Sequence, residues 1–331
     1  MDFSLTVKKI EHVVSRASRV LLVGHQRPDA DALGSIQAFG GWLRQLNIDY
    51  VCYCADRADN PNLEFLTDWE PYVTTPEEVL GQRYDLIVVF DSGDLEYAGT
   101  DQLVQRLSPR PIIVNIDHHF TNLAYGDINL VDASAASTTE ILHRFFNQLR
   151  VAVTPQMSSA LLAGIINDTY NFTNANTGYA TLAAASRLLA QGANLQHVSQ
   201  AILQTKPLAA MQFWGETLLR LEYNKEWELA TVVITHADVA KLESQMPRNA
   251  GDPREVTEGV ANFLNNLGGV KAALVLREQS DGTIKGSFRT NDDLIDVSAL
   301  AKMLGGGGHR KAAGFTLAGR LEQTPRGWQV K

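Results

Sequence analysis

The chain has 331 residues and a formal net charge of −8, because 29 Lys and Arg stand against 37 Asp and Glu. Hydrophobic residues make up 45% of it and charged residues 20%, a globular composition that excludes wholesale disorder. The length predicts two domains, and the charge argues against broad binding to nucleic acid or to an anionic membrane. A local site for a small anionic substrate is compatible with that charge.

The two cysteines, Cys52 and Cys54, lie in a run with the pattern of a strand. Neighbours on one strand face are poorly placed for a disulfide, so buried thiols in a reducing cytoplasm are the favoured interpretation. A Cys-x-Cys metal site is the alternative. No stretch reaches 18 apolar residues, and the N-terminus has helical spacing instead of the pattern of a signal peptide. We therefore expect a cytoplasmic protein without a membrane span.

The first half alternates strand and helix patterns. Continuous apolar runs at 19–24, 49–54, 85–90 and 111–116 predict strands, and residues 33–46 have helical spacing. Strands that are apolar throughout are typical of a parallel sheet covered by helices on both faces. We therefore expect an α/β fold built on a parallel, doubly wound sheet.

Helical spacing then dominates, with helices expected at 138–149, 155–166, 178–190 and 195–203. In the last third, the expected elements are strands at 228–235, 270–277, 284–289 and 315–317 and helices near 253–267 and 297–304. Asp281-Gly282 suits the turn of a hairpin between the second and third of these strands. The expected organisation is a first domain at 1–204, a helical linker at 205–223 and a smaller α+β domain with a mixed sheet at 224–331.

Four polar clusters follow apolar runs. They are His25 with Asp29 and Asp31 after the first strand, Asp91 after the third, Asp117-His118-His119 after the fourth, and Asp168 at the end of a helical run. The carboxyl ends of parallel strands share one edge of the sheet, so the topology brings the first three clusters together. No topological argument places Asp168 with them.

Several converging aspartates would repel one another unless cations lie between them. Two divalent ions would offset the charge of −4 that is carried by the carboxylates of Asp29, Asp31, Asp91 and Asp168. The imidazoles of His25 and His118 complete a mixed nitrogen and oxygen set, which favours Mn²⁺ over Mg²⁺ or Co²⁺. Such a pair of ions can activate water for phosphoryl transfer. Each residue alone is more often a cap or turn residue, and the ordered set carries the prediction.

This ordered set resembles the DHH phosphoesterases, a family named for the triplet seen here as Asp117-His118-His119, and the resemblance covers nearly the whole chain. The second domain resembles the DHH-associated domain through the segments Gly305-Gly306-Gly307-Gly308-His309 and Ala312-Ala313-Gly314. Within the family the chain is most similar to the standalone group of oligoribonucleases (nanoRNases) and 3′-phosphoadenosine-5′-phosphate phosphatases. The resemblance implies a parallel-sheet catalytic domain joined by a helical linker to a substrate-binding domain.

The resemblance also implies roles for individual residues. One Mn²⁺ would be held by His25, Asp29 and Asp91, and the other by Asp31, Asp91, His118 and Asp168. His119 would face the substrate phosphate and protonate the leaving oxygen, and Asp117 would orient a metal-binding histidine. Substrate contacts are expected from Arg289, Gly305, Gly306, Gly307, Gly308 and His309. For Arg310 and Lys311, a phosphate contact and a solvated surface stay equally open.

The expected function is an Mn²⁺-dependent phosphoesterase. It would hydrolyse short oligoribonucleotides to mononucleotides, remove the 3′-phosphate of 3′-phosphoadenosine 5′-phosphate, or do both. The alternatives are hydrolysis of cyclic di-AMP or linear pApA, and a non-catalytic regulator that binds nucleotide or metal. The expected partner is short RNA or a small nucleotide, with no long nucleic-acid track and no membrane. The sequence leaves open whether the chain forms a homodimer.

Overall fold

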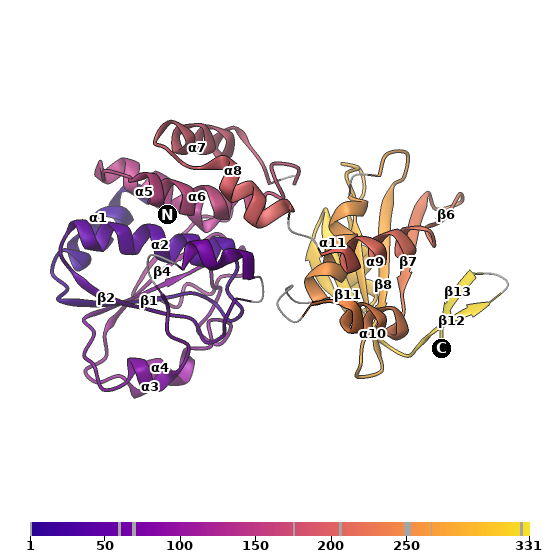
Figure 1. Ribbon diagram of the computed structural model, residues 1–331, viewed down its shortest axis with the longest axis horizontal. Helices are drawn as coiled ribbons and strands as arrows, with labels where there is room; N and C mark the ends of the chain where they lie inside the picture. The colour runs from indigo at the N-terminus through magenta and orange to yellow at the C-terminus, as the bar shows by residue number, and fades with distance from the viewer. Residues whose placement is uncertain are drawn as a thin grey trace. The chain divides into compact units, whose positions relative to one another are not determined.

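The computed structural model describes residues 2–58, 61–67, 71–174, 176–204, 207–247, 253–265, 267–324 and 327–331. The chain divides into two compact units, Met1–Thr205 and Lys206–Lys331. Each unit is built around its own main β-sheet (Figure 1). The expected bounds of the domains stay predictions.

The sheet of the first unit has the strand order β2-β1-β3-β4-β5, and all neighbouring strands are parallel. Its strands are β1 (Arg19–Val23), β2 (Asp49–Tyr53), β3 (Leu86–Phe90), β4 (Ile112–Asp117) and β5 (Ile128–Val131). The first four confirm the predicted parallel sheet. Strand β5 was not predicted, because it is a short edge strand with a weak apolar pattern, in which Leu130 alone is buried.

Helices cover both faces of this sheet (Figure 1). Successive strand residues point to opposite faces, so Leu22 and Val88 belong to one hydrophobic core while Leu21 and Ile87 belong to the other. The helices are α1 (Phe3–Val14), α2 (Ala30–Gln45), α3 (Pro76–Val79), α4 (Asp101–Arg106), α5 (Thr138–Leu149), α6 (Pro155–Asp168), α7 (Tyr179–Ala190) and α8 (Leu195–Ser199), with a 3-10 helix η1 (Pro61–Leu66) and a π-helix η2 (Gln200–Gln204). The doubly wound arrangement is confirmed, although α3 and α4 were not predicted.

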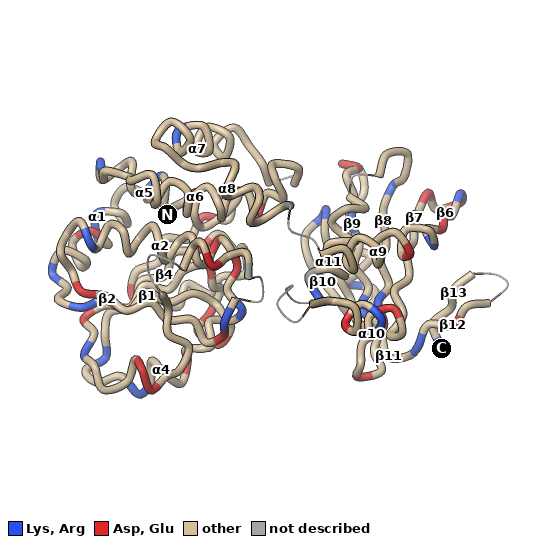
Figure 2. Tube along the Cα trace, viewed as in Figure 1, with Lys and Arg blue, Asp and Glu red and all other residues tan. Residues whose placement is uncertain are grey.

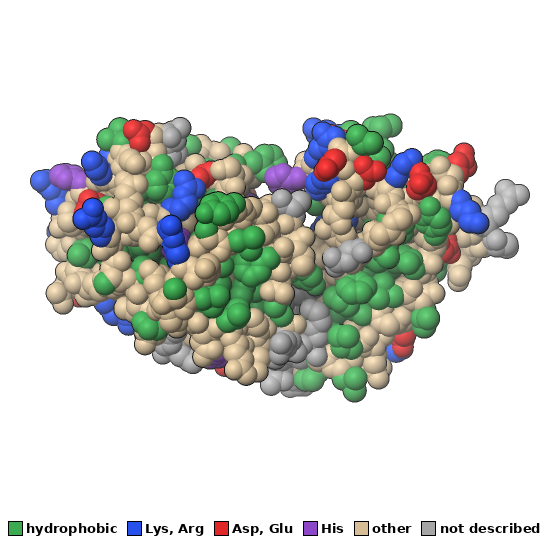
Figure 3. Space-filling view, turned by 90° about the horizontal axis from the view of Figure 1, so that it is seen from above, with side chains coloured by type: hydrophobic (Ala, Val, Ile, Leu, Met, Phe, Trp, Pro, Cys, Tyr) green, Lys and Arg blue, Asp and Glu red, His purple; other side chains and the backbone are tan. Residues whose placement is uncertain are grey.

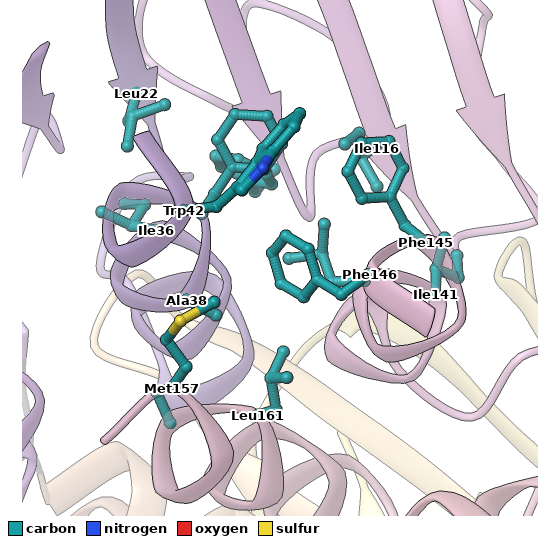
Figure 4. Packing of buried hydrophobic residues seen from close by; sticks show 14 of the residues in the cluster. Leu22, Ile36, Ala38, Trp42, Ile116, Ile141, Phe145, Phe146, Met157 and Leu161 are labelled. Carbon is teal, nitrogen blue, oxygen red and sulfur yellow. The ribbon is translucent and has the colours of Figure 1, made fainter. Parts of the chain in front are cut away.

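The larger core joins helices α2, α5 and α6 to the sheet (Figure 4). Trp42 of α2 meets Phe145 of α5 edge to face, with ring centroids 5.3 Å apart. Helices α2 and α6 approach closely at Gly34, where a Cβ would lie 2.4 Å from the carbonyl oxygen of Ala160. This packing fixes the helix ends that lie at the carboxyl edge of the sheet.

The second unit has a six-stranded mixed sheet in the order β10-β11-β9-β8-β7-β6. Its strands are β6 (Glu222–Asn224), β7 (Leu229–Ile234), β8 (Ala272–Glu278), β9 (Thr283–Arg289), β10 (Gly307–His309) and β11 (Ala312–Ala318), followed by a two-stranded ribbon of β12 (Leu321–Thr324) and β13 (Gly327–Val330). Its helices are α9 (Leu208–Leu218), α10 (His236–Gln245), α11 (Pro253–Leu264) and α12 (Val297–Met303). Among the described strands of the mixed sheet, β7 and β8 pair in parallel and the other neighbours pair antiparallel.

This mixed sheet confirms the expected α+β second domain, and β8 pairs with β9 across the predicted Asp281-Gly282 turn. The short strands β6, β10, β12 and β13 and helix α10 were not predicted. Helix α9 falls within the expected linker at 205–223 and packs with α10, α11 and β7 of the second unit. Residues 205 and 206 lie outside the described residues, and a separate linker stays a prediction.

Several surface features bear on the predicted partners. Lys and Arg are interspersed with Asp and Glu along the traces of both units (Figure 2). Hydrophobic side chains are exposed on both units, as the face in Figure 3 shows. None of the described helices has the length and apolar character needed to cross a membrane. Cys52 and Cys54 are buried thiols that form no disulfide, as predicted.

Candidate metal centre

Polar side chains gather at the carboxyl edge of the parallel sheet. His25 lies in the loop after β1, Asp29 caps the N-terminus of α2, and Asp31 lies in the first turn of that helix. Asp91 directly follows β3, and Asp117 is the last residue of β4. Strand β1 lies between β2 and β3, so the connections that follow β1 and β2 run to opposite sides of β1. Open parallel sheets bind ligands at such a point, beyond the carboxyl ends of the strands.

Asp91 stands at the centre of this cluster. Its Oδ2 lies 3.5 Å from Nε2 of His25, and its Oδ1 lies 3.5 Å from Nε2 of His118. Its backbone is left-handed, with a φ of +56°, which aspartate tolerates better than most residues. The whole residue is 2% exposed. The two oxygens of one buried carboxylate therefore face two different histidines.

On one side of Asp91, the ligand-type atoms of His25, Asp29 and Asp91 lie within 4.8 Å of one another. Nε2 of His25 is 3.6 Å from Oδ1 of Asp29. Nδ1 of the same imidazole lies 2.6 Å from the carbonyl oxygen of Gln26, which makes Nδ1 the donor. A histidine whose Nδ1 proton is engaged by a carbonyl has Nε2 available as a metal ligand.

On the other side, Asp31, His118 and Asp168 form a second set of ligand-type atoms within 4.8 Å of one another. Nε2 of His118 lies 3.1 Å from Oδ2 of Asp168, the last residue of α6. Asn167 connects the two sides, because its amide donates to Oδ2 of Asp29 at 3.1 Å and to Oδ1 of Asp168 at 3.0 Å. The structure thus brings Asp168 to the cluster, for which the sequence offered no topological reason.

Asp168 reaches the cluster because α6 packs closely against α2. Gly164, one turn before Asp168, lies directly against Asp31: a Cβ there would be 2.3 Å from Oδ1 of that carboxylate. A glycine at this point lets the end of α6 approach the start of α2, where a side chain would separate them.

The Asp117-His118-His119 triplet divides between two environments. Asp117 is fully buried, and its Oδ1 accepts from Nδ1 of His119 at 2.7 Å. It also accepts the backbone N–H groups of His118 and His119, and Asn122 donates to its Oδ2 at 2.6 Å. Asp117 was expected to orient a metal-binding histidine; the ring that it holds is that of His119, the residue expected to face substrate. His119 is left with Nε2 on a side chain that is 42% exposed.

Electrostatics at this edge reflect crowded negative charge. Burial, together with the charges of Asp168 and Asp91, raises the pKa of Asp31 well above its ordinary value. Burial and the neighbouring charges of Asp29 and Asp91 likewise raise the pKa of Asp168 to about 6, although His118 opposes them. Burial lowers the pKa of His118, but the hydrogen bond and charges of the surrounding carboxylates outweigh it and raise that pKa to about 11. Without a cation, protons have to offset the charge.

A pair of divalent cations fits this arrangement. Asp31 receives three hydrogen bonds from N–H and O–H donors, an environment built for an ionised carboxylate, while burial and like charges disfavour that ionised form. A nearby cation removes the conflict. The 3.1–3.6 Å separations between His and Asp atoms also suit neighbouring ligands of one ion, because metal–ligand bonds of about 2.1 Å at right angles separate ligand atoms by about 3 Å.

Several residues of the site were missed from the sequence. Thr138 and Thr139 donate to Asp31 and Asp91, and their place at the start of a predicted helix was the one signal available. Tyr97 lies over the imidazole of His25, with ring centroids 5.4 Å apart, and nothing in its sequence surroundings marks it. No sequence pattern indicated the bridging amide of Asn167 either.

The predicted substrate residues of the second unit lie on neighbouring strands. Arg289 of β9 pairs with Ala312 of β11, which pairs in turn with His309 of β10. Cross-strand partners point to the same face, so Arg289 and His309 flank the small Ala312 at about 10 Å from one another. The guanidinium donates to Oδ1 of Asn262 from Nε at 3.3 Å and from Nη2 at 3.1 Å, and to the carbonyl of Phe288. It is half-buried and fixed in direction.

The glycine run has two structural environments. Gly306 and Gly308 pack on β11: a Cβ on Gly306 would lie 2.1 Å from the carbonyl oxygen of Gly314, and one on Gly308 would lie 2.6 Å from a Cα of the same strand. Gly305, with a φ of +77°, and Gly307 would meet nothing within 4 Å. All four glycines were expected to allow close approach of a ligand, whereas packing against β11 accounts for Gly306 and Gly308.

Two family domains match this chain. Residues 19–165 match the N-terminal domain of the DHH family, and residues 239–326 match the DHHA1 domain. Together they cover most of both units, in the order expected from the sequence motifs. The chain therefore belongs to the DHH family of phosphoesterases, which are hydrolases.

Particular relatives refine this assignment. The chain is 29% identical over 301 residues to the bifunctional oligoribonuclease and PAP phosphatase NrnA of Thermus thermophilus, a match that covers 91% of this chain and 84% of that protein. It is 27% identical over 343 residues to the cyclic-di-AMP phosphodiesterase GdpP of Geobacillus thermodenitrificans, covering 96% of this chain but 48% of that protein.

Solved structures agree on the fold. An exopolyphosphatase-related protein from Bacteroides fragilis superposes with a TM-score of 0.79 at 19% identity, over 94% of this chain and 90% of that one. RecJ of Thermus thermophilus, solved in complex with Mn²⁺, superposes with a TM-score of 0.50 at 13% identity, over 95% of this chain and 52% of that one.

Proposed function

We propose that the cluster binds two divalent ions that share Asp91. One ion would be held by His25, Asp29 and Asp91, and the other by Asp31, Asp91, His118 and Asp168. The division of the two Asp91 oxygens between the two histidines supports this proposal. The mixture of carboxylate and imidazole favours Mn²⁺ over Mg²⁺ or Co²⁺, and RecJ, which has a similar fold, was solved with Mn²⁺.

The proposed activity is Mn²⁺-dependent hydrolysis of short oligoribonucleotides to mononucleotides and of 3′-phosphoadenosine 5′-phosphate to AMP. The observation that carries it is the convergence of four aspartates and two histidines on one sheet edge. The choice of substrate rests on the similarity to NrnA, because this chain and that relative match over most of both lengths. The formal net charge of −8 also suits a short substrate better than a long strand.

When bound, two divalent ions lower the pKa of a water molecule and offset negative charge on the phosphoryl oxygens. The protein positions them through Asp91 and supplies a proton through His119. Because Nδ1 of His119 is engaged by Asp117, the ring can hold a second proton at Nε2. Burial lowers the pKa of His119, but Asp117 and Asp91 raise it by more, so the net shift favours that protonated form. His119 would give this proton to the leaving oxygen.

In the second unit, we propose that Arg289 and His309 contact a phosphate or base of the substrate. The guanidinium is preoriented by Asn262, which lowers the entropy lost when it engages an anion. Gly305 and Gly307 would allow a ligand to approach the backbone, because nothing lies within 4 Å of a Cβ at either position.

A second candidate is hydrolysis of cyclic di-AMP or pApA. Similarity to GdpP over 96% of this chain favours it, although the chain spans about half of that protein. The candidate of another class, a regulator that binds nucleotide without cleaving it, would need the same ion site but no turnover. One assay separates all three.

The test is a substrate panel with the protein first freed of metal and then supplied with Mn²⁺. Short oligoribonucleotides, 3′-phosphoadenosine 5′-phosphate, pApA and cyclic di-AMP are incubated in parallel, and products are resolved by chromatography. Mononucleotides from the first substrate and AMP from the second are expected. Cleavage restricted to pApA or cyclic di-AMP would support the second candidate, and binding without products would support the regulator.

Asp91→Asn tests the ion site itself, because asparagine keeps the left-handed backbone while the shared charge is lost. Loss of about 4 kcal/mol of transition-state stabilisation corresponds to a drop in kcat/KM of about 10³-fold. Asp127→Asn is the matched control, since Asp127 pairs with Arg110 and accepts from Ile113 at the start of β4. Near-normal turnover by Asp91→Asn would overturn the two-ion proposal.

The cytoplasmic location and the homodimer stay predictions.

A further inference from the structure

The first turn of α5 contacts two of the proposed ligand carboxylates. We infer that Thr138 and Thr139 in this turn are positioning residues, which set the carboxylate oxygens that face the two ions. The inference rests on the proposed ion site and adds an element to it. It also predicts that the two threonines act differently, because one holds a ligand of a single ion and the other holds the ligand that both ions share.

Asp31 is held through both of its oxygens. Its Oδ2 accepts the backbone N–H of Thr138 at 2.7 Å, and its Oδ1 accepts the N–H of Thr139 at 3.0 Å and the hydroxyl of Thr139 at 2.6 Å. A carboxylate has about four acceptor positions, two on each oxygen. Oδ1 is therefore saturated, and the acceptor position that remains belongs to Oδ2. The hydrogen bonds thus select Oδ2 as the oxygen that can face an ion.

The direction of the Thr139 hydroxyl is set by its neighbour. Ser137 caps α5 by accepting the N–H of Glu140 at 3.0 Å, and its own oxygen lies 2.9 Å from Oγ1 of Thr139. An ionised Asp31 can only accept, so the Thr139 proton goes to Asp31 and the Ser137 proton goes to Thr139. Asp31, Ser137 and Thr139 are all fully buried, so water does not compete for these bonds.

Thr138 acts on the other carboxylate. Its hydroxyl donates to Oδ1 of Asp91 at 3.1 Å, on the side that faces His118. The turn therefore holds Asp31 through two backbone N–H groups and a hydroxyl but holds Asp91 through a hydroxyl alone. This asymmetry allows each carboxylate to be loosened by a separate substitution that leaves the backbone bonds in place.

The turn can act as a positioning element because α5 is fixed by its far end. Phe145 and Phe146 are fully buried and face the core beneath α2, where Phe145 packs on Trp42 (Figure 4). Asp31 cannot swing toward α6, because Gly164 lies against it: a Cβ there would be 2.4 Å from Oγ1 of Thr139 and 2.3 Å from the carboxylate. A helix N-terminus also stabilises the negative charge of the carboxylate that it holds.

The experiment counts bound Mn²⁺ by the electron paramagnetic resonance signal of the free ion, during titration of metal-free protein. Thr139→Val removes the hydroxyl and keeps the shape and the backbone N–H groups. We expect the ion held by Asp31 to bind about 10- to 100-fold more weakly. The ion at His25 and Asp29 should keep its affinity within about twofold. Thr139→Ser, which restores the hydroxyl, should recover both affinities.

Thr138→Val should weaken both ions, because it loosens the shared Asp91. The matched control is Thr181→Val: the hydroxyl of Thr181 donates to Glu140 of the same helix at 2.8 Å but contacts neither ligand. This control should lower thermal stability and leave both ions bound. Should Thr139→Val fail to fold, Thr139→Ala removes the same hydroxyl without adding bulk and takes its place in the titration.

Unchanged binding of both ions by folded Thr139→Val or Thr139→Ala would overturn the inference. So would equal weakening of both ions in the Thr139 variants and in Thr181→Val, because that result means general loosening of α5. Absence of Mn²⁺ binding by the unmodified protein would overturn the ion site proposed above, and this outcome is distinct from the other two.

Discussion

The polar residues proposed for function are buried in the first unit and accessible in the second. At the carboxyl edge of the first sheet, Asp31 and Asp117 are fully buried and Asp91 is 2% exposed. In the second unit, Arg289 is half-buried and His309 is exposed, and both lie on a sheet face that small residues line. The proposed ion site is built from buried charge, and the proposed substrate contacts are accessible side chains and backbone.

This contrast bears on how a function is inferred. Converging buried carboxylates oppose folding, since each loses hydration and repels the others. A cluster that persists against this cost indicates a cation. Gly306 and Gly308 do not oppose folding in this way, because β11 leaves no room for a Cβ at either position and a glycine is needed there for packing. The cluster of aspartates in the first unit is therefore a strong indication of a ligand site, and the run of glycines in the second unit is a weaker one.

The largest expected effect separates proton transfer from ion binding within the first unit. His119→Ala should lower kcat by about 10²- to 10⁴-fold, the usual contribution of a general acid, while Mn²⁺ binding stays within a few-fold. The measurement is kcat at saturating Mn²⁺ and substrate, with the Mn²⁺ titration as its control. Asp117→Asn should lower kcat less, since the ring keeps its place and loses the charge that favours its protonated form. A His119→Ala protein that binds no Mn²⁺ would make His119 a ligand instead.

A smaller effect is expected at the proposed substrate residues of the second unit. Arg289→Ala should raise KM about tenfold or more, because a charged hydrogen bond contributes about 1.5–3 kcal/mol. Asn262→Ala should raise KM by several-fold with kcat unchanged, since the amide only orients the guanidinium. Both are measured by steady-state kinetics on 3′-phosphoadenosine 5′-phosphate. A fall in kcat without a rise in KM would argue that Arg289 acts on the chemical step.

The part of each proposed site that could be predicted from the sequence differs between the two units. Apolar runs followed at once by His25, Asp91 and Asp117 predicted a sheet edge, because parallel strands end on one side. The convergence of Asp168 could not be predicted, since it depends on the close approach of α2 and α6 at Gly164. Helix pairing of this kind is a long-range property that periodicity does not record.

Contacts made by backbone groups were hidden for a related reason. A sequence lists side chains, and the N–H groups that hold Asp31 belong to a turn whose position is set by the core under α5. In the second unit, Arg289 was identified, but its partner Asn262 lies on another element 27 residues away. The short strands β5 and β10 were missed because three or four residues carry little pattern.

The glycine run offers a test of the difference between packing and ligand binding. Gly306→Ala should destabilise the protein by about 1–3 kcal/mol, because its Cβ would overlap the carbonyl of Gly314. Gly307→Ala meets open space and should change stability by less than about 0.5 kcal/mol. The measurement is urea unfolding, followed by KM for the folded variants. A raised KM in Gly307→Ala alone would assign that glycine to ligand approach, and an unchanged KM would limit the run to packing.

The smallest effect concerns His143, a buried polar residue of the first unit that lies outside the proposed ion site. Burial and the charge of Arg187 lower its pKa from 6.5 to about 4, and the side chain is 2% exposed. Between pH 6.5 and 4 the unfolded chain therefore binds a proton that the folded chain does not, so stability falls as the pH falls.

By pH 5.5, one unit below the unfolded pKa, this linkage should cost about 1.4 kcal/mol. His143→Gln, which does not titrate, should lose that part of the slope. The measurement is the urea midpoint of both proteins in chelator from pH 5 to 7.5, and the difference between them cancels the titration of the aspartate cluster. Parallel curves would mean that His143 has the same pKa in the folded and the unfolded chain, which would contradict the shift caused by its burial.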